Sequence, residues 1–241
     1  MKPGQFIING VDSESIKTKI QSRPVIETPR RRISFKQGFG QNGSLPYDEK
    51  AYNNTQLSLY LYTEGGDASV NRETIFGLFN SSSYLDLTMY FDDKKIYKVM
   101  LAEPIKFESR YYMNGGVSCE VILTVKPYKH MVSSPPVLLN SNGSLVNVHG
   151  EYSQPLITIT GSGDVTLNIN GNTFHVKGVS GTMVLDSITG NAYKMSGSVM
   201  QNLNSQVYSR TYPVLKPGTN TISWIGSVSQ LKIEPRWRKL V

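Results

Sequence analysis

Apolar and polar residues alternate along much of the first half of the chain, and this period of two is typical of half-buried β-strands. The alternation is clearest in Thr55–Tyr62, Leu85–Phe91 and Val117–Val125. Weaker patterns predict strands at Phe6–Ile8, Lys95–Ala102 and Ile105–Tyr112, and an edge strand at Arg23–Pro29. The edge position follows from the two prolines of that last run, because proline cannot donate a ladder hydrogen bond.

One segment of the first half has the pattern of an α-helix, near Ser69–Asn80. Its apolar residues, Ile75 and Phe79 among them, recur at the spacing of one helix face. Ser69 or Asn71 is expected to cap its N-terminus. The first half is therefore predicted to be a strand-rich unit with a single helix.

The second half alternates in short runs that turn signals separate. Val165–Ile169 is followed by Asn170-Gly171, the strongest hairpin signal in the chain. The same period recurs in Ile157/Ile159, Ile222/Trp224 and Leu231/Ile233, which places Trp224 in the core beside Ile222. With no helical pattern among these runs, the second half is predicted to be a β-sandwich.

A short linker separates the two halves. Residues 133–136, Ser-Ser-Pro-Pro, have no apolar periodicity, and the prolines keep the backbone extended. The predicted domains are therefore residues 1–132 and 137–241, and the predicted fold class is mainly β.

The few cysteines and histidines limit the catalytic and metal sites that the chain can form. Of 241 residues one is a cysteine, so Cys119 can form no disulfide within the chain and no Cys-rich zinc site. Cys119 shares a predicted strand face with apolar residues, which favours a buried, inert thiol. The histidines, His130, His149 and His175, lack metal-ligand spacing, and the chain has no Gly-x-Ser-x-Gly motif. The sequence therefore predicts no enzyme and no catalytic, cofactor-binding or metal-binding residue.

The net charge of +7 includes the run Arg30-Arg31-Arg32. Such a run can contact phosphates, but solvated edge charges or a salt-bridged subunit contact are favoured because no series of stacking aromatics accompanies it. Residues 38–43, Gly-Phe-Gly-Gln-Asn-Gly, are similar to a phosphate-binding loop without its Lys-Ser/Thr ending and its helix. Neither nucleotide binding nor specific nucleic-acid binding is predicted.

Residues 36–54 are too long for a tight turn, which predicts a functional loop or an arm between subunits. The predicted residues of a subunit or partner interface are Arg30, Arg31, Arg32, Phe39, Tyr47, Tyr60, Tyr62 and Trp237. Three roles stay open for Trp237 among its basic neighbours: a cation–π contact, a cap on the sandwich, or an interface anchor.

The end of the chain carries a pattern that resembles a known family. Residues 212–224, Tyr-Pro-Val-Leu-Lys-Pro-Gly-Thr-Asn-Thr-Ile-Ser-Trp, and 233–238, Ile-Glu-Pro-Arg-Trp-Arg, resemble the close of the distal tail proteins of long-tailed, non-contractile bacteriophages. Similar stretches lie upstream at Pro155–Val165, Ile169–Gly171, Leu185–Tyr193, Phe6–Gly10 and Cys119–Tyr128. The resemblance covers nearly the whole chain and rests on the order and spacing of these motifs together.

The resemblance implies a virion structural protein. Its first domain would be related to tail-tube proteins and form a six-subunit ring around a channel for DNA, as a single ring or as two rings back to back. Its second domain would be a galectin-like β-sandwich outside the ring. The implied partners are the tail-tube protein, the tape-measure protein, the tail-associated protein at the tip and, in some members, a receptor-binding protein.

The implied location is the distal end of the phage tail, after synthesis and assembly in the host cytoplasm. No signal peptide and no apolar run of membrane-spanning length is visible in the sequence. The alternative function is a carbohydrate-binding module that uses the second domain to contact host glycans, which would need an aromatic platform.

Overall fold

A computed structural model describes residues 1–40, 42–108 and 114–241 of the chain. The chain divides into two compact units, unit 1 (Met1–Val132 with Leu240–Val241) and unit 2 (Ser133–Lys239). The last two residues thus belong to unit 1, whereas the sequence assigned them to the second domain.

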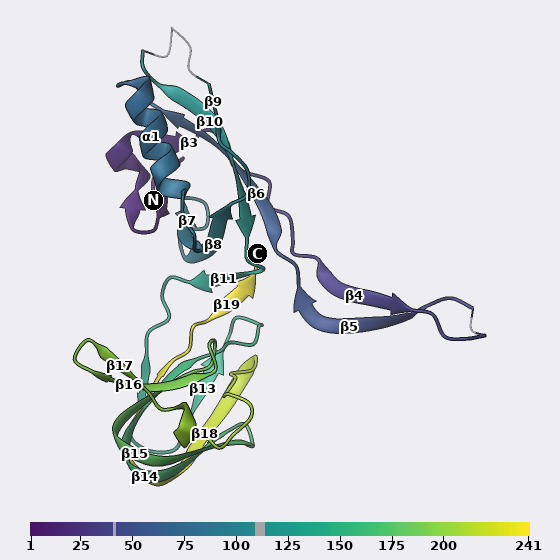
Figure 1. The fold of residues 1–241 in the computed structure, drawn as a ribbon, viewed down its shortest axis with the longest axis vertical. Helices are drawn as coiled ribbons and strands as arrows, with labels where there is room; N and C mark the ends of the chain where they lie inside the picture. The colour runs from purple at the N-terminus through teal and green to yellow at the C-terminus, as the bar shows by residue number, and fades with distance from the viewer. Residues whose placement is uncertain (41, 109–113) are drawn as a thin grey trace. The chain divides into compact units, whose positions relative to one another are not determined.

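Unit 1 is built on one antiparallel sheet that curls around its core (Figure 1). Its strands are β1 (Phe6–Ile8), β2 (Val11–Asp12), β3 (Thr18–Ile20), β6 (Thr55–Thr63), β7 (Leu85–Met89), β8 (Lys95–Leu101), β9 (Lys106–Glu108), β10 (Val117–Val125) and β11 (Tyr128–Met131). Their order is β2-β1-β7-β8-β10-β6-β3, with β9 paired to β10 and β11 paired to β8.

The core of unit 1 follows from the alternation in its central strands. Leu57, Leu59 and Leu61 of β6 are buried and lie opposite buried residues of β10. The helix α1 (Ala68–Phe79) adds Ile75 and Phe79 to the same core. The other face of these strands carries the polar residues, as the period of two predicts.

The helix begins one residue earlier than predicted, and the predicted caps are wrong. Asp67 is the N-cap, and its carboxylate accepts hydrogen bonds from the backbone N–H groups of Ser69 and Val70 at 2.7 and 3.1 Å. Asn71 instead donates its side-chain amide to the carbonyl oxygens of Gly65 and Gly115. A charged carboxylate at the positive end of a helix is a strong cap, which explains why Asp67 caps the helix rather than Ser69 or Asn71.

Cys119 is buried, as predicted, with 6% of its surface exposed. Burial raises the pKa of its thiol to about 12, so the thiolate is scarce at neutral pH. The side chain therefore packs as a small apolar residue.

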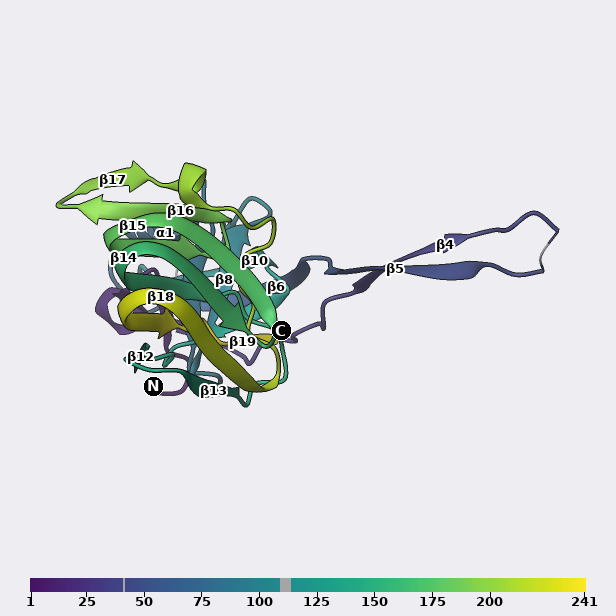
Figure 2. The same ribbon diagram turned by 90° about the horizontal axis from the view of Figure 1, so that it is seen from below.

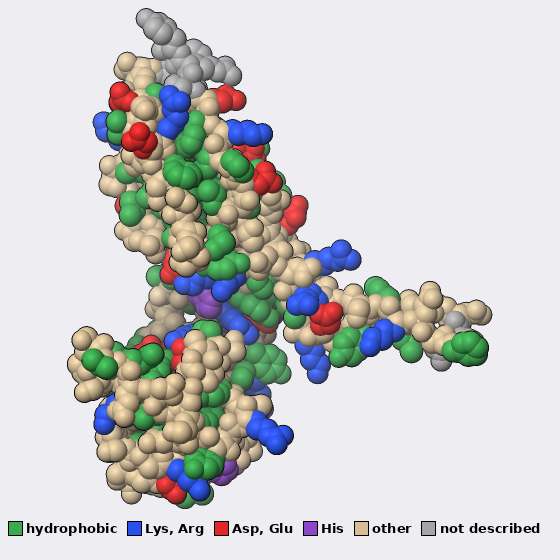
Figure 3. Space-filling model, in the orientation of Figure 1, with side chains coloured by type: hydrophobic (Ala, Val, Ile, Leu, Met, Phe, Trp, Pro, Cys, Tyr) green, Lys and Arg blue, Asp and Glu red, His purple; other side chains and the backbone are tan. Residues whose placement is uncertain are grey.

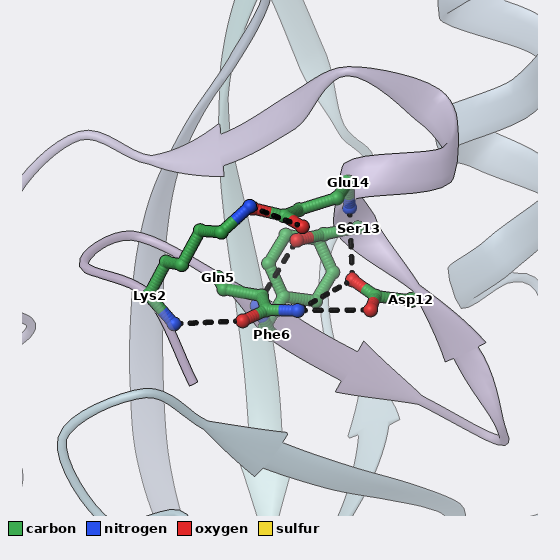
Figure 4. Close-up of polar contacts among 6 residues, drawn as sticks. All are labelled: Lys2, Gln5, Phe6, Asp12, Ser13 and Glu14. Carbon is green, nitrogen blue, oxygen red and sulfur yellow. Dashed lines mark hydrogen bonds and ion pairs between the residues drawn. The ribbon is translucent and has the colours of Figure 1, made fainter.

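The N-terminal segment is held by a polar network (Figure 4). Asp12 caps the short 3-10 helix η1 (Ser13–Ile16) by accepting a hydrogen bond from the N–H of Glu14, and it also accepts from the amide of Gln5. The backbone N–H of Phe6 donates to the hydroxyl of Ser13 at 3.0 Å. These bonds tie β1, β2 and η1 together at one end of the sheet.

Two strand predictions of the first half differ from the structure. Arg23–Pro29 is irregular rather than an edge strand, although the hydroxyl of Thr55 on β6 donates to the carbonyl of Glu27 at 3.2 Å. The two prolines remove the donors that would continue the ladder. The strand predicted at Ile105–Tyr112 is β9, Lys106–Glu108, and residues 109–113 lie outside the described residues.

Unit 2 is also a single antiparallel sheet, of order β12-β18-β14-β15-β16-β17, with β13 paired to β18. Its strands are β12 (Val137–Leu139), β13 (Gly143–Asn147), β14 (Leu156–Ile169), β15 (Asn172–Asp186), β16 (Asn191–Ser196), β17 (Val199–Asn202) and β18 (Gly218–Glu234), followed by β19 (Arg238–Leu240) at the boundary with unit 1. A second 3-10 helix, η3 (Asn204–Gln206), follows β17. The predicted turn at Asn170-Gly171 joins β14 to β15, with φ angles of 56° and 84° that suit this pair of residues.

The short strands predicted for unit 2 are halves of long, bent strands. Ile157/Ile159 and Val165–Ile169 both lie on β14, which shifts register against β18 near Gly161. Bulges of this kind bend a strand and let one sheet fold over its own core. Trp224, predicted to be buried, is half-buried.

An ion pair between Asp186 and Arg236 stabilises unit 2. Burial raises the pKa of Asp186, but hydrogen bonds from Arg236 at 2.6 Å and from the N–H of Ile188 outweigh it and hold the pKa below its usual value. A lowered pKa in the folded state contributes stability above the unfolded-state pKa, about 3.9, and that stability is lost as pH falls through the folded-state pKa.

We therefore expect Asp186→Asn to lower the free energy of unfolding of unit 2 by about 1–3 kcal/mol near neutral pH. The difference from the parent protein should shrink below the unfolded-state pKa of about 3.9 and disappear below the lowered folded-state pKa of Asp186, because only there is the carboxylate protonated in both states. Urea unfolding followed by tryptophan fluorescence measures unit 2 alone, because Trp224 and Trp237 are both in it. A difference that is the same at all pH values would contradict the ionic contribution.

Candidate functional site: an exposed hairpin arm

The segment predicted to be a loop or an arm is part of a β-hairpin. The strands β4 (Arg31–Lys36) and β5 (Leu45–Tyr52) form a two-stranded sheet of their own, and Figures 1 and 2 show this ribbon outside the curled sheet of unit 1. We call residues 31–52 the arm. It begins five residues earlier than the sequence indicated, at the arginine run.

Apolar side chains lie exposed on both faces of the arm. Cross-strand partners share a face, so Ile33 and Phe35 project on the same side as Asp48 and Pro46, whereas Tyr47 and Leu45 project on the other side, opposite Ser34 and Lys36. The large exposed hydrophobic side chains among the described residues of the arm are Ile33, Phe35, Phe39, Leu45 and Tyr47. Phe35 is 67% exposed and Phe39 is fully exposed. A two-stranded hairpin without a core beneath it is marginally stable by itself, so the arm has the composition of a contact surface.

The arginine run is paired within the arm. Arg31 donates Nε and a terminal nitrogen to the two carboxylate oxygens of Asp48, and Arg32 forms an ion pair with Glu49 at 2.8 Å. The hydrogen bond from Arg31 lowers the pKa of Asp48, helped by the backbone N–H of Lys50. Figure 3 shows charged side chains beside hydrophobic side chains along the arm. Arg31 and Arg32 thus do not form an unneutralised basic cluster of the kind that phosphates attract.

The base of the arm is braced by aromatic residues. The guanidinium of Arg31 lies over the ring of Tyr52, 5.9 Å from its centroid, and Tyr52 meets Tyr128 edge to face at 6.1 Å. Below the hairpin, the N–H of Asn53 donates to the carbonyl of Arg30 at 2.9 Å. Lys50 has a φ of 53°, and this left-handed residue lies where the register between β4 and β5 shifts.

Tyr60 and Tyr62 lie on a different surface, the polar face of β6. Tyr60 is 46% exposed, and its hydrogen bond to Glu120 on β10 raises the pKa of the phenol. Hollows of about 310 and 320 Å³ lie on either side of Tyr60. Tyr62 is half-buried. The structure therefore does not bring these tyrosines together with Phe39 and Tyr47 within one chain.

Trp237 is buried in unit 2, with 8% of its surface exposed. Its ring lies 5.9 Å from that of His149, and its backbone N–H donates to the hydroxyl of Ser134 at 3.3 Å. These contacts are both with residues of unit 2. An anchor that enters a partner's pocket must be exposed, and Trp237 is not exposed in this chain.

The sequence missed part of the arm. The predicted interface residues do not include Ile33, Phe35 and Leu45. A signal was present, because apolar residues alternate on both sides of the glycine-rich turn, as in a hairpin.

The described residues include no group of three or more His, Cys, Asp or Glu side chains placed to hold a metal ion. Within the same residues, no helix has both the length and the apolar character needed to cross a membrane.

Neither the family models nor the curated proteins include a match to this sequence. Solved structures do match. The Dit protein of phage SPP1, described as a paradigm of the hub adsorption apparatus in phages that infect Gram-positive bacteria, aligns with a TM-score of 0.72 at 12% identity, over 95% of this chain and 98% of that chain.

The baseplate of phage p2 in its activated conformation provides two further matches. The form with Sr aligns with a TM-score of 0.58 at 13% identity, over 95% of this chain and 97% of that chain. The form with Ca aligns with a TM-score of 0.56 at 13% identity, over 98% of both chains. The predicted mainly β fold is confirmed, and the chain has the fold of the distal tail protein of phage SPP1 over nearly its whole length.

Proposed function

We propose that this protein is a structural component of a phage tail, a distal tail protein that forms a six-subunit ring and joins the tail tube to the baseplate or tip. The observation that carries the proposal is the alignment with the SPP1 Dit hub over 95% of the chain. The ring would leave a channel for DNA, and the protein would serve assembly rather than catalysis. Its place is the distal end of the virion tail.

The arm supports self-assembly. Its apolar side chains have no core beneath them, so a second copy of the chain is the surface that would bury them. The sheet of unit 1 ends in the short strands β2 and β3, whose outer edges would be covered when subunits close a ring. We propose that the arm of each subunit lies on its neighbour.

The proposed partners are those of a tail hub. They are the tail-tube protein above the ring, the tape-measure protein in its channel, the tail-associated protein below and, through unit 2, a receptor-binding protein. The ion pairs of Arg31 and Arg32 support the prediction that the run faces protein rather than DNA, because a lumen that bound phosphates tightly would slow the passage of DNA.

The test is the mass of the purified intact protein in solution, with negative-stain images of the same fraction. We expect a species of six 26.9 kDa chains, or twice six, with a central hole. A ring of another subunit number would contradict the six-subunit proposal. A protein that stays monomeric, alone and with its tail-tube protein, would contradict ring formation.

A further inference from the structure

Unit 2 has a pocket of about 280 Å³ on the hairpin β16–β17. Its lining includes Asp186, Asn191, Tyr193, Met200 and Asn202. None of these residues belongs to the arm or to the polar face of β6, so the pocket is independent of the proposed ring contacts.

Strand register explains why these side chains meet. Asn191 lies opposite Asp186, and Tyr193 lies opposite Asn202. Ala192, between Asn191 and Tyr193, points the other way and is fully buried in the core. The pocket is therefore on the outer face of β15, β16 and β17, and the same face continues to Met200.

Asn204 fixes the orientation of the two pocket amides. The backbone N–H of Ala192 donates to Oδ1 of Asn204 at 2.6 Å, so the Nδ2 group of Asn204 must be the donor to Oδ1 of Asn191 at 2.9 Å. The backbone N–H of Asn204 donates to Oδ1 of Asn202 at 2.8 Å. The Oδ1 atoms of Asn191 and Asn202 thus both accept a hydrogen bond from Asn204. Their Nδ2 groups have no partner among the described residues and stay available to a ligand.

We infer that this pocket binds a neutral carbohydrate. The ring of Tyr193 offers an apolar face to the C–H groups of a pyranose, and Met200 extends the apolar wall. The two oriented amides supply donors for hydroxyl or ring oxygens at the edge of that ring. An aromatic face flanked by fixed polar groups is the arrangement that gives a small-molecule site both contact area and orientation.

The charges around the pocket disfavour an anionic ligand. The described residues that line the pocket include no Lys, Arg or His. The carboxylate of Asp186 lies in its wall, paired with Arg236 and kept ionised by that partner. The lining thus offers a phosphate-bearing glycan no cation, and Arg236 is already engaged by Asp186, so the pocket favours uncharged sugars.

The test uses the intact protein and an array of bacterial surface glycans, neutral and phosphorylated. The dissociation constant of the best neutral glycan is then measured by calorimetry for the parent and for the variants. We expect Tyr193→Leu to weaken binding about tenfold through loss of the stacking face. Asn202→Asp keeps the acceptor that Asn204 needs and removes the donor, and it too should weaken binding about tenfold.

Asn168→Asp is the matched control, because Asn168 also uses Oδ1 as an acceptor, from the N–H of Gly171, and lies outside the pocket. Its affinity should equal that of the parent. No binding to any neutral glycan, a preference for phosphorylated glycans, or equal affinity in the parent and both pocket variants would each overturn the inference. None of these results bears on ring formation, which the mass measurement tests separately.

Discussion

Replacing Phe35 and Leu45 of the arm with serine is expected to convert the ring into monomers without unfolding the protein. The two side chains project from opposite faces of the arm and are 67% and 59% exposed in the single chain. If a neighbouring subunit covers them, each contributes about 1.5–3 kcal/mol to every subunit contact. Losing both raises the dissociation constant of a contact by roughly 10²–10⁴-fold, which a ring of six such contacts does not survive at micromolar concentration.

The measurement is the mass in solution of parent and variant at equal concentration, together with thermal unfolding. The unfolding midpoint of the monomeric variant should equal that of a parent sample diluted until it is monomeric, because neither side chain belongs to the core of unit 1. Ile225→Ser is the matched control, since Ile225 is 77% exposed and lies in unit 2. Intact rings in the double variant would show that the arm is not the subunit contact.

Gly161→Ala is expected to destabilise unit 2 by about 3 kcal/mol, which is a large part of the roughly 5–15 kcal/mol that stabilises an ordinary domain. A Cβ atom on Gly161 would lie 2.1 Å from the carbonyl oxygen of Ser227, where β14 passes β18 at the register shift. The added Cβ atom and the carbonyl oxygen of Ser227 are both attached directly to the backbone, so the close contact is relieved only if β14 and β18 move apart. That movement breaks the ladder where the sheet bends.

Gly163→Ala provides the comparison on the same strand. Gly163 has a φ of 77° and no atom within 4 Å of its would-be Cβ, so alanine there meets only backbone strain, about 1–2 kcal/mol. Urea unfolding followed by tryptophan fluorescence reports unit 2 for both variants, as for Asp186→Asn. A loss at Gly161 that is no larger than the loss at Gly163 would show that the strands relieve the contact with Ser227 at little cost.

The parts of the fold that the sequence predicts well are those with one buried face. The alternation of Leu57, Leu59 and Leu61 identifies β6 because the core covers one side of that strand and solvent covers the other. The Asn170-Gly171 turn can be predicted equally well, since its two positive φ angles favour these residue types. Local rules decide both features.

The arm and the bent strands are harder to predict, because a local pattern of apolar and polar residues does not show what covers a ribbon or which distant strand pairs with it. Ile33 and Leu45 project from opposite faces of a ribbon with no core, so they produce no one-sided pattern. The continuity of β14 through Gly161 depends on β18, which lies about seventy residues away in the sequence. Trp224 has the period of a core residue but lies near that bend, and it is half-buried.

The chain returns to unit 1 after it has completed unit 2. The chain leaves unit 1 after Val132 and re-enters it at Leu240, and the backbone N–H of Val241 donates to the carbonyl of Pro127 at 3.0 Å. Exit and re-entry are therefore neighbouring points on one scaffold. Unit 2 is therefore an insertion in unit 1, between Val132 and Leu240. We expect that a module whose own ends lie close together can replace unit 2 and leave every strand of the unit 1 sheet from β1 to β10 in place.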